Sequence, residues 1–211
     1  MKYIKLFENF EDYDPYELMI LPPNKKGEMI VREIKKSEPN TELVSDLISL
    51  GANLNWQDED GETALHKCVE GDNPEIAEML IDAGADLNIQ GDDEESALYF
   101  CVYYDNPYIA RMLIDAGADL NIQDIYGETA LHCCARHNRT EIARMLIEAG
   151  ADLNVQTNSG KTLLHYCAHT NNPEIARMLI DAGADKTIPD YKGDFPYEFV
   201  ETEELKELLQ P

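Results

Sequence analysis

A short motif that returns every 33 residues constrains the fold of this chain more than any other feature. The motif is Ala-x-Leu-Asn with a decayed last copy, and no insertion or deletion separates the copies. They start at Ala52, Ala85, Ala118, Ala151 and Ala184. Constant spacing of this length indicates structural units that stack side by side, each burying its apolar face against its neighbours. Positions where the copies differ are therefore where function is expected.

Each period predicts two short helices. In the first full copy, small or apolar residues recur at helical spacing over residues 64–69 and again over 76–81. Between them, Asp72, Asn73 and Pro74 suit a left-handed turn, a helix N-cap and a first helical residue. Glycine takes the left-handed C-cap conformation at little cost, so a glycine marks the end of each second helix. These glycines are Gly84, Gly117, Gly150 and Gly183.

The start of each first helix carries a recognisable hexapeptide. The copies read TALHKC from Thr63, SALYFC from Ser96, TALHCC from Thr129 and TLLHYC from Thr162. This pattern resembles the Thr-Pro-Leu-His-x-Ala motif of ankyrin repeats, which share the 33-residue period. The resemblance covers residues 25–211 and implies an all-α ankyrin-repeat solenoid. Its helix-turn-helix units would be joined by short loops and β-turns and closed by a capping unit at each end.

The same register divides the chain into predicted units. Residues 1–24 form an arm outside the repeat, 25–57 an N-capping unit and 190–211 a C-capping unit. The four full repeats between the caps span 58–90, 91–123, 124–156 and 157–189. One loop departs from the pattern, because Glu94 stands where the other copies have glycine. We expect that loop tip to have its own shape.

The arm has two interpretations. Tyr3, Ile4, Phe7 and Phe10 recur at three and four, which predicts a short amphipathic helix that packs on the first unit or frays. Alternatively, the arm is a peptide addressed to a receptor or a viral particle, since MKYIKLFENF is similar to openings of large tailed-phage proteins. A signal peptide is not expected, because no apolar core with a cleavage site follows the lysines. No stretch approaches the roughly 20 apolar residues of a membrane span.

The charge balance restricts the partners. The chain has 17 Lys and Arg against 42 Asp and Glu, a formal net charge of −25. Such a field repels nucleic-acid backbone and anionic membrane, and it accelerates encounter with a basic partner. Alternatively, the acids only keep a long surface soluble. We expect a protein partner with a basic patch, no direct contact with nucleic acid or membrane, and a monomer in preference to an oligomer.

Cysteine and histidine positions argue against a metal site, and no phosphate-binding glycine loop, Gly-x-Ser-x-Gly or His-Glu-x-x-His motif indicates an active site. Four of the five cysteines form one column at steps of 33, and the helices of neighbouring units are too far apart for disulfides. These buried thiols, which replace the motif alanine, are Cys68, Cys101, Cys134 and Cys167. They indicate a reducing, intracellular setting such as the cytoplasm. The resemblance implies that His66, His132 and His165 make structural hydrogen bonds. We expect no catalytic residue, no metal and no cofactor.

Two functions remain open. The first is a non-enzymatic protein-interaction module, with a viral or regulatory role, that binds through the concave surface of loop tips and first helices, as the resemblance implies. The second is an acidic mimic of nucleic acid that inhibits a DNA- or RNA-binding protein. A mimic needs carboxylates along one whole face, whereas Arg136, Lys161 and Lys192 interrupt the second half. We therefore favour protein recognition.

The predicted binding surface consists of loop-tip and first-helix positions at which the copies differ. Its acidic part comprises Glu59, Asp60, Glu62, Glu70, Asp92, Asp93 and Glu95. Its aromatic centre and basic end comprise Tyr103, Tyr104, Ile125, Tyr126, Glu128, Arg136, His137, Asn158, Ser159, Lys161, His169, Thr170, Tyr191 and Lys192. Tyrosine and arginine dominate the binding energy of many interfaces. In the alternative interpretation, the tyrosines only fill grooves between units.

Three repeated asparagines complete the candidates. Asn88, Asn121 and Asn154 each follow an aspartate by two residues and a leucine by eight. In animal ankyrin repeats, asparaginyl hydroxylases act on this context, so the resemblance makes them candidate modification sites. The alternative is a loop asparagine that bonds to the backbone.

Overall fold

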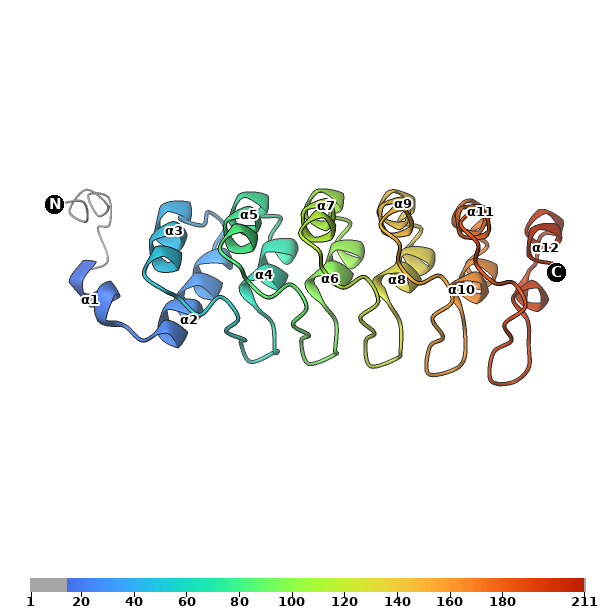
Figure 1. Ribbon diagram of the computed structural model, residues 1–211, viewed down its shortest axis with the longest axis horizontal. Helices are drawn as coiled ribbons and strands as arrows, with labels where there is room; N and C mark the ends of the chain where they lie inside the picture. Colours follow the sequence, from blue (N-terminus) through green and yellow to red (C-terminus); the bar gives the residue numbers. More distant parts are fainter. Residues whose placement is uncertain (1–14, 211) are drawn as a thin grey trace. The chain divides into compact units, whose positions relative to one another are not determined.

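The computed structural model describes residues 15–210, which form two compact units that meet in sequence at Asp92 and Asp93. In both units short helices stand in pairs, with loops between the pairs (Figure 1). None of the secondary-structure elements between residues 15 and 210 is a strand, and none of these helices is long and apolar enough to cross a membrane. The helix predicted around Tyr3 to Phe10 lies outside the described residues.

The first unit contains the N-terminal cap and the first full repeat. Its helices are α1 (Pro15–Ile20), α2 (Pro23–Ile34), α3 (Thr41–Ser49), α4 (Ala64–Glu70) and α5 (Pro74–Asp82). First helix packs on first helix and second on second, α2 against α4 and α3 against α5. This stacking buries the apolar stripe of each helix against the neighbouring pair.

The cap includes residues that the sequence register placed in the arm. Helix α2 begins at Pro23 rather than within the predicted capping unit, and Leu18 of α1 is buried. The ammonium group of buried Lys26 donates to the carbonyl of Leu50 at 2.7 Å and faces that of Met19 at 3.4 Å. Because a buried ammonium needs acceptors, Lys26 fixes α1 and the end of α3 to α2.

The second unit continues the pattern to the C-terminal cap. Its helices are α6 (Ala97–Tyr103), α7 (Pro107–Asp115), α8 (Ala130–His137), α9 (Thr140–Glu148), α10 (Leu163–His169), α11 (Pro173–Asp181), the 3-10 helix η2 (Pro196–Phe199) and α12 (Glu203–Leu209). The first helices pack in the order α6, α8, α10 and η2, and the second helices in the order α7, α9, α11 and α12. The short η2 replaces a full first helix in the cap.

The turns between paired helices match the sequence prediction. The residue before each N-cap has a left-handed backbone, with φ between 49° and 58° at Asp72, Asp105, Asn138 and Asn171. Aspartate and asparagine tolerate this conformation better than other side chains. The N-cap side chains of Asn106 and Asn172 accept the backbone N–H of Ile109 and Ile175.

The loops that join successive helix pairs are linked tip to tip by backbone hydrogen bonds. Within each unit, a backbone N–H at a loop tip donates to a carbonyl of the preceding tip, as from Asp92 to Asp60 and from Ile125 to Asp93. Glu94 has φ +59°, close to the +70° to +93° of the glycines at equivalent positions. The loop still differs from the others in part, because Gln90 and Ser96 at its ends form an isolated β-bridge that no other described loop has. Glu94 thus adopts the left-handed conformation that glycine has in the other loops.

We expect Glu94→Gly to stabilise the chain by about 0.5–1 kcal/mol, because glycine adopts positive φ without the steric cost that a Cβ incurs. Glu78→Gly is the control, since it places glycine at an exposed position inside α5 and should destabilise by about 1 kcal/mol. Urea unfolding of both variants measures the two effects. A loss of stability in Glu94→Gly would show that interactions of the glutamate side chain stabilise the fold by more than the strain of its positive φ destabilises it.

Candidate protein-interaction surface

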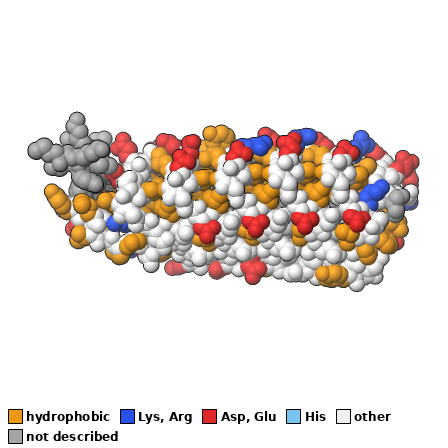
Figure 2. Space-filling view, in the orientation of Figure 1, with side chains coloured by type: hydrophobic (Ala, Val, Ile, Leu, Met, Phe, Trp, Pro, Cys, Tyr) orange, Lys and Arg blue, Asp and Glu red, His pale blue; other side chains and the backbone are white. Residues whose placement is uncertain are grey.

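Most of the predicted surface is exposed. In the first unit, Glu59, Asp60, Glu70 and Asp92 are exposed and Glu62 is half-buried. In the second unit, Glu95 and Lys161 are half-buried, and the exposed residues are Asp93, Tyr103, Tyr104, Ile125, Tyr126, Arg136, His137, Asn158, Ser159, His169, Thr170, Tyr191 and Lys192. Figure 2 shows acidic side chains repeated at regular intervals over the helices and loops of the face in view.

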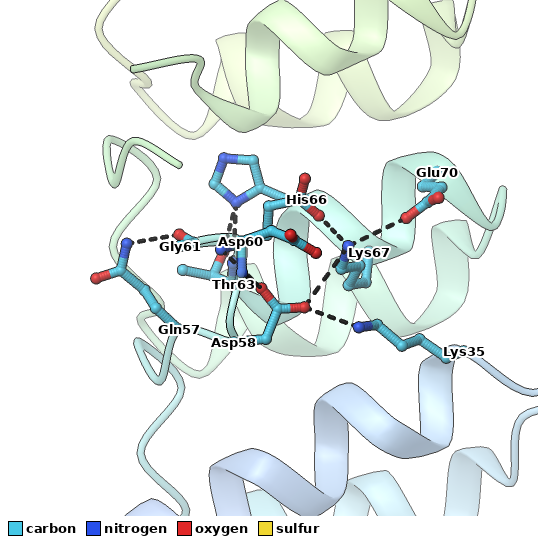
Figure 3. Close-up of polar contacts among 10 residues, drawn as sticks. Lys35, Gln57, Asp58, Asp60, Gly61, Thr63, His66, Lys67 and Glu70 are labelled. Carbon is cyan, nitrogen blue, oxygen red and sulfur yellow. Dashed lines mark hydrogen bonds and ion pairs between the residues drawn. The ribbon is translucent and has the colours of Figure 1, made fainter. Parts of the chain in front are cut away.

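In the first unit, part of the predicted acidic surface is a charge cluster around Lys67 (Figure 3). The Lys67 side chain is only 7% exposed, and its ammonium group pairs with Glu62, with Glu70 at 3.3 Å and with Asp58 at 3.6 Å. Asp58 also binds Lys35 at 2.8 Å and accepts the backbone N–H of Asp60 and of Glu62. Glu62 and Glu70 are thus engaged inside the unit.

This cluster keeps its charges at neutral pH. Burial alone would raise the pKa of Asp58, but hydrogen bonds from Lys35 and the backbone, with the charge of Lys67, outweigh it and lower that pKa. Burial opposes the charged form of Lys67 as well, yet Glu62 and the other two carboxylates raise its pKa. The cluster therefore acts as a fixed internal ion network.

In the second unit, exposed aromatic rings gather at the C-terminal end of α6. The rings of Tyr103 and Tyr104 meet edge to face with centroids 5.2 Å apart, and Phe100 lies 5.8 Å from Tyr104. Tyr103 also contacts the ring of His137 on α8 at 5.9 Å. Tyr103 thus contacts a neighbouring repeat, yet it stays 56% exposed, and Tyr104 is 43% exposed.

Arg136, which precedes His137 in the last turn of α8, pairs with a buried carboxylate. The Glu128 side chain is 4% exposed, and it accepts hydrogen bonds from Arg136 and from the Tyr166 hydroxyl of α10. The Arg136 guanidinium also lies over the Tyr166 ring, 5.6 Å from its centroid. The assignment of Glu128 to the accessible surface was therefore wrong, because its carboxylate serves as an internal anchor between two repeats.

These residues line a pocket of about 510 Å³. Tyr126 forms one side, and the loop around Asn158 and Ser159 forms another. The Arg136 side chain remains 41% exposed, so the pocket presents a guanidinium whose position is fixed from behind.

The motif histidines are structural, as the resemblance implied. In each of the three, the Nδ1 atom accepts the backbone N–H of the threonine that starts the helix, at 3.2 Å in His66, 3.1 Å in His132 and 3.0 Å in His165. His165 also joins the next unit, with its Nε2 atom 3.1 Å from the carbonyl of Asp194. Burial, aided by the charge of Arg136, lowers the pKa of His132 to about 4.

We expect the chain to lose stability between pH 7.5 and pH 5 partly through His132. Its folded pKa lies below the value of about 6.5 in the unfolded chain, so the unfolded state binds more protons as the pH falls. The contribution of neutral His132 to the free energy of unfolding is fully present above pH 6.5. This contribution should drop by about 2 kcal/mol by pH 5. In His132→Gln, which preserves the acceptor for Thr129, urea unfolding should show a correspondingly weaker pH dependence. An identical pH profile would contradict this assignment.

The remaining candidates have internal partners. The Oδ1 atoms of Asn121 and Asn154 accept the backbone N–H of Asp152 and Asp185 in the following repeats, both at 2.8 Å. This geometry supports the structural interpretation of these asparagines, and their hydroxylation stays a prediction.

All five cysteines are buried, and none of them forms a disulfide bond. Within residues 15–210, no group of three or more His, Cys, Asp or Glu side chains is arranged to hold a metal ion.

Comparison with known proteins identifies the family. The family model of ankyrin repeats, which spans three copies, matches residues 34–124 and 117–190 of this chain. The two matches together cover more than half of the chain. The chain belongs to the ankyrin-repeat family. Ankyrin repeats are generally protein-interaction modules and non-enzymatic scaffolds.

Solved structures of ankyrin-repeat proteins have the same fold as this chain. The ankyrin repeat domain of Bcl-3, described as a unique member of the IkappaB protein family, is 26% identical with a TM-score of 0.76. The match covers 80% of this chain and 76% of that chain. Because 630 solved chains are similar, the fold alone does not indicate a partner. No curated protein matches the sequence.

Within this ankyrin scaffold, sequence reasoning missed two features. Tyr108, at the start of α7, is 65% exposed and was not singled out because it lies on a second helix. Tyr166 was also missed, although it occupies the column of Lys67 and, like Lys67, contacts the glutamate that precedes a first helix. Comparison of that column across the repeats would have indicated a shared role.

Proposed function

We propose that the chain binds a protein partner through the tyrosine face of its second unit. We define this face as Tyr103, Tyr104, Ile125, Tyr126 and His137. The observation that carries the proposal is the concentration of exposed apolar side chains there. Among the described residues, six of the nine exposed large apolar side chains belong to the second unit, and four of these six lie on the tyrosine face.

Repeat architecture makes these exposures informative. The scaffold positions of the second unit are buried at the same register in every copy, so the tyrosines are additions that the stack does not require. Tyrosine supplies a large, rigid contact area with a polar end and loses little conformational entropy on binding. These side chains belong to first helices and loop tips of the second unit, where a partner can reach them.

Charge supports rapid association with a partner that has a basic patch. The first unit exposes Glu59, Asp60 and Asp92, and the chain as a whole carries a net charge of −25. Exposed charges of this kind steer encounter more than they strengthen the bound state. A viral or regulatory role and a monomeric state remain predictions.

Tyr104→Ala and Tyr126→Ala should each weaken partner binding by roughly 2 kcal/mol, because truncation removes a large anchor from the centre of the interface. A partner is first identified by photo-crosslinking from position 126 in the source cell, and affinities are then measured by calorimetry on the full chain. Tyr108→Ala is the matched control, since it removes a tyrosine outside the face that is as exposed as Tyr126, 65% against 64%. It should leave the affinity unchanged.

Equal affinity of the double variant and the wild type, with identical melting curves, would contradict the proposal. A partner that binds nucleic acid and is released from it by this chain would instead favour the nucleic-acid mimic. Glu59→Ala should mainly slow association and reduce its salt dependence.

A further inference from the structure

We propose that the pocket between Tyr126, Arg136 and Tyr166 binds a carboxylate side chain of the partner protein. This inference rests on the proposed function, because it names what one part of the interaction surface recognises. The pocket of about 510 Å³ is large enough for an acidic side chain with part of its backbone.

The charge that a ligand meets in the pocket is positive. The two ionisable groups of opposite sign that line it, Arg136 and Glu128, have side chains 41% and 4% exposed, respectively. A ligand therefore contacts the outer edge of the guanidinium, with the carboxylate of Glu128 behind it. Since Coulomb energy falls with distance, attraction to the nearer cation outweighs repulsion from the deeper anion.

The guanidinium is already oriented. Glu128 binds it from one side, and the Tyr166 ring lies beneath it at 5.6 Å. Glu128 in turn is held by the Tyr166 hydroxyl. A fixed arginine loses less conformational entropy when it binds a ligand than a free surface arginine does.

The loop opposite supplies further hydrogen-bonding groups. Ser159 is exposed, and its hydroxyl lies 3.1 Å from that of Thr157. The Asn158 amide donates to the carbonyl of Ile125 at 2.9 Å, which fixes the loop against the preceding tip. Ser159 can thus donate to a ligand oxygen, while the exposed ring of Tyr126 covers the aliphatic part of the side chain.

A cationic ligand is the alternative occupant. The Oε2 atom of Glu128 is buried and has no hydrogen-bond partner among the described residues, so an ammonium group would satisfy it. However, that atom is almost inaccessible to a ligand, whereas the Arg136 side chain is 41% exposed. The observations therefore favour an anion.

The test is a titration of the full chain with three small probes, followed by NMR. The probes are N-acetylglutamate amide, N-acetylglutamine amide and N-acetyllysine amide. The glutamate probe should shift the Arg136 Nε–Hε signal and the amide signals of Asn158 and Ser159, with a Kd on the order of 1 mM. The glutamine probe should bind about tenfold more weakly, because it lacks the charge that arginine pairs with.

Two variants locate the site. Arg136→Gln retains an amide donor for Glu128 and should abolish the preference for the glutamate probe, whereas Arg111→Gln, an exposed arginine on α7, should not change it. Ser159→Ala changes a residue of an exposed loop. It should raise the Kd of the glutamate probe about threefold without affecting the fold. Preferential binding of the lysine probe, equal binding of glutamate and glutamine probes, or no shift at these residues would overturn the proposal.

The titration needs no partner, so the two proposals fail separately. If the wild-type chain does not bind the glutamate probe, but Tyr104→Ala and Tyr126→Ala still weaken partner binding, only the carboxylate site is overturned. Retained probe binding with no effect of the tyrosine variants would overturn only the tyrosine face.

Discussion

Lys67→Met should lower the free energy of unfolding by about 3 kcal/mol. The methionine preserves the volume of the side chain but removes the cation from a site that is 7% exposed. The Asp58 and Glu62 side chains, 9% and 17% exposed, then lose the charge that offsets their burial. Lys35 continues to neutralise part of Asp58, so the cost should stay at the lower end of the range for broken buried ion pairs.

Lys25→Met is the matched control for this prediction. Lys25 pairs with Glu28 at 2.7 Å, but its side chain is 45% exposed. Water solvates both charges of such a pair, so its removal should change stability by no more than about 0.5 kcal/mol. Chemical denaturation measures both variants. If the two lysines have equal effects, the cluster around Lys67 is not a buried ion network.

Glu128→Ala should have a comparable effect in the second unit, about 3 kcal/mol. The substitution removes the acceptor shared by Arg136 and Tyr166 and leaves a cavity beneath them. It also removes a contact between successive repeats, because Tyr166 belongs to the next first helix. Glu128→Gln keeps an acceptor oxygen and should cost about 1 kcal/mol.

Glu148→Ala is the control here. This glutamate is exposed at the end of α9, where an acid is unfavourable for the helix dipole, so its removal should change stability by at most about 0.5 kcal/mol in either direction. A Glu128→Ala variant as stable as this control would show that Arg136 and Tyr166 find other partners, and it would remove the basis for an oriented guanidinium.

Several features of the fold were predictable because they depend on local chemistry. The helix pairs, the left-handed turns at Asp72 and Asn138, and the C-terminal glycines follow from residue types that suit one backbone conformation. The family could also be recognised from the hexapeptides, because each hexapeptide starts a helix with the same threonine or serine cap.

The loop at Glu94 shows where local chemistry fails. Glutamate disfavours positive φ, yet Glu94 has a left-handed backbone like the glycines at equivalent positions. In the structure, the hydrogen bonds from one loop tip to the next fix the conformation in each unit, and these bonds join residues about one period apart in the chain. Such contacts are invisible to an argument that considers one loop at a time.

The sequence by itself determined the repeat, its two helices, its turns and the positions at which copies differ, since all of these repeat at a fixed interval. Only the tertiary structure decided which of the differing residues are accessible. By sequence, Glu62 and Glu128 cannot be distinguished from exposed loop acids such as Glu59, yet Lys67 binds the first, and Arg136 and Tyr166 bind the second. Burial depends on the side chains of the same and adjacent repeats. The tyrosines are exposed because no side chain of an adjacent repeat covers them fully, whereas Arg136 and Glu128 bind each other between repeats.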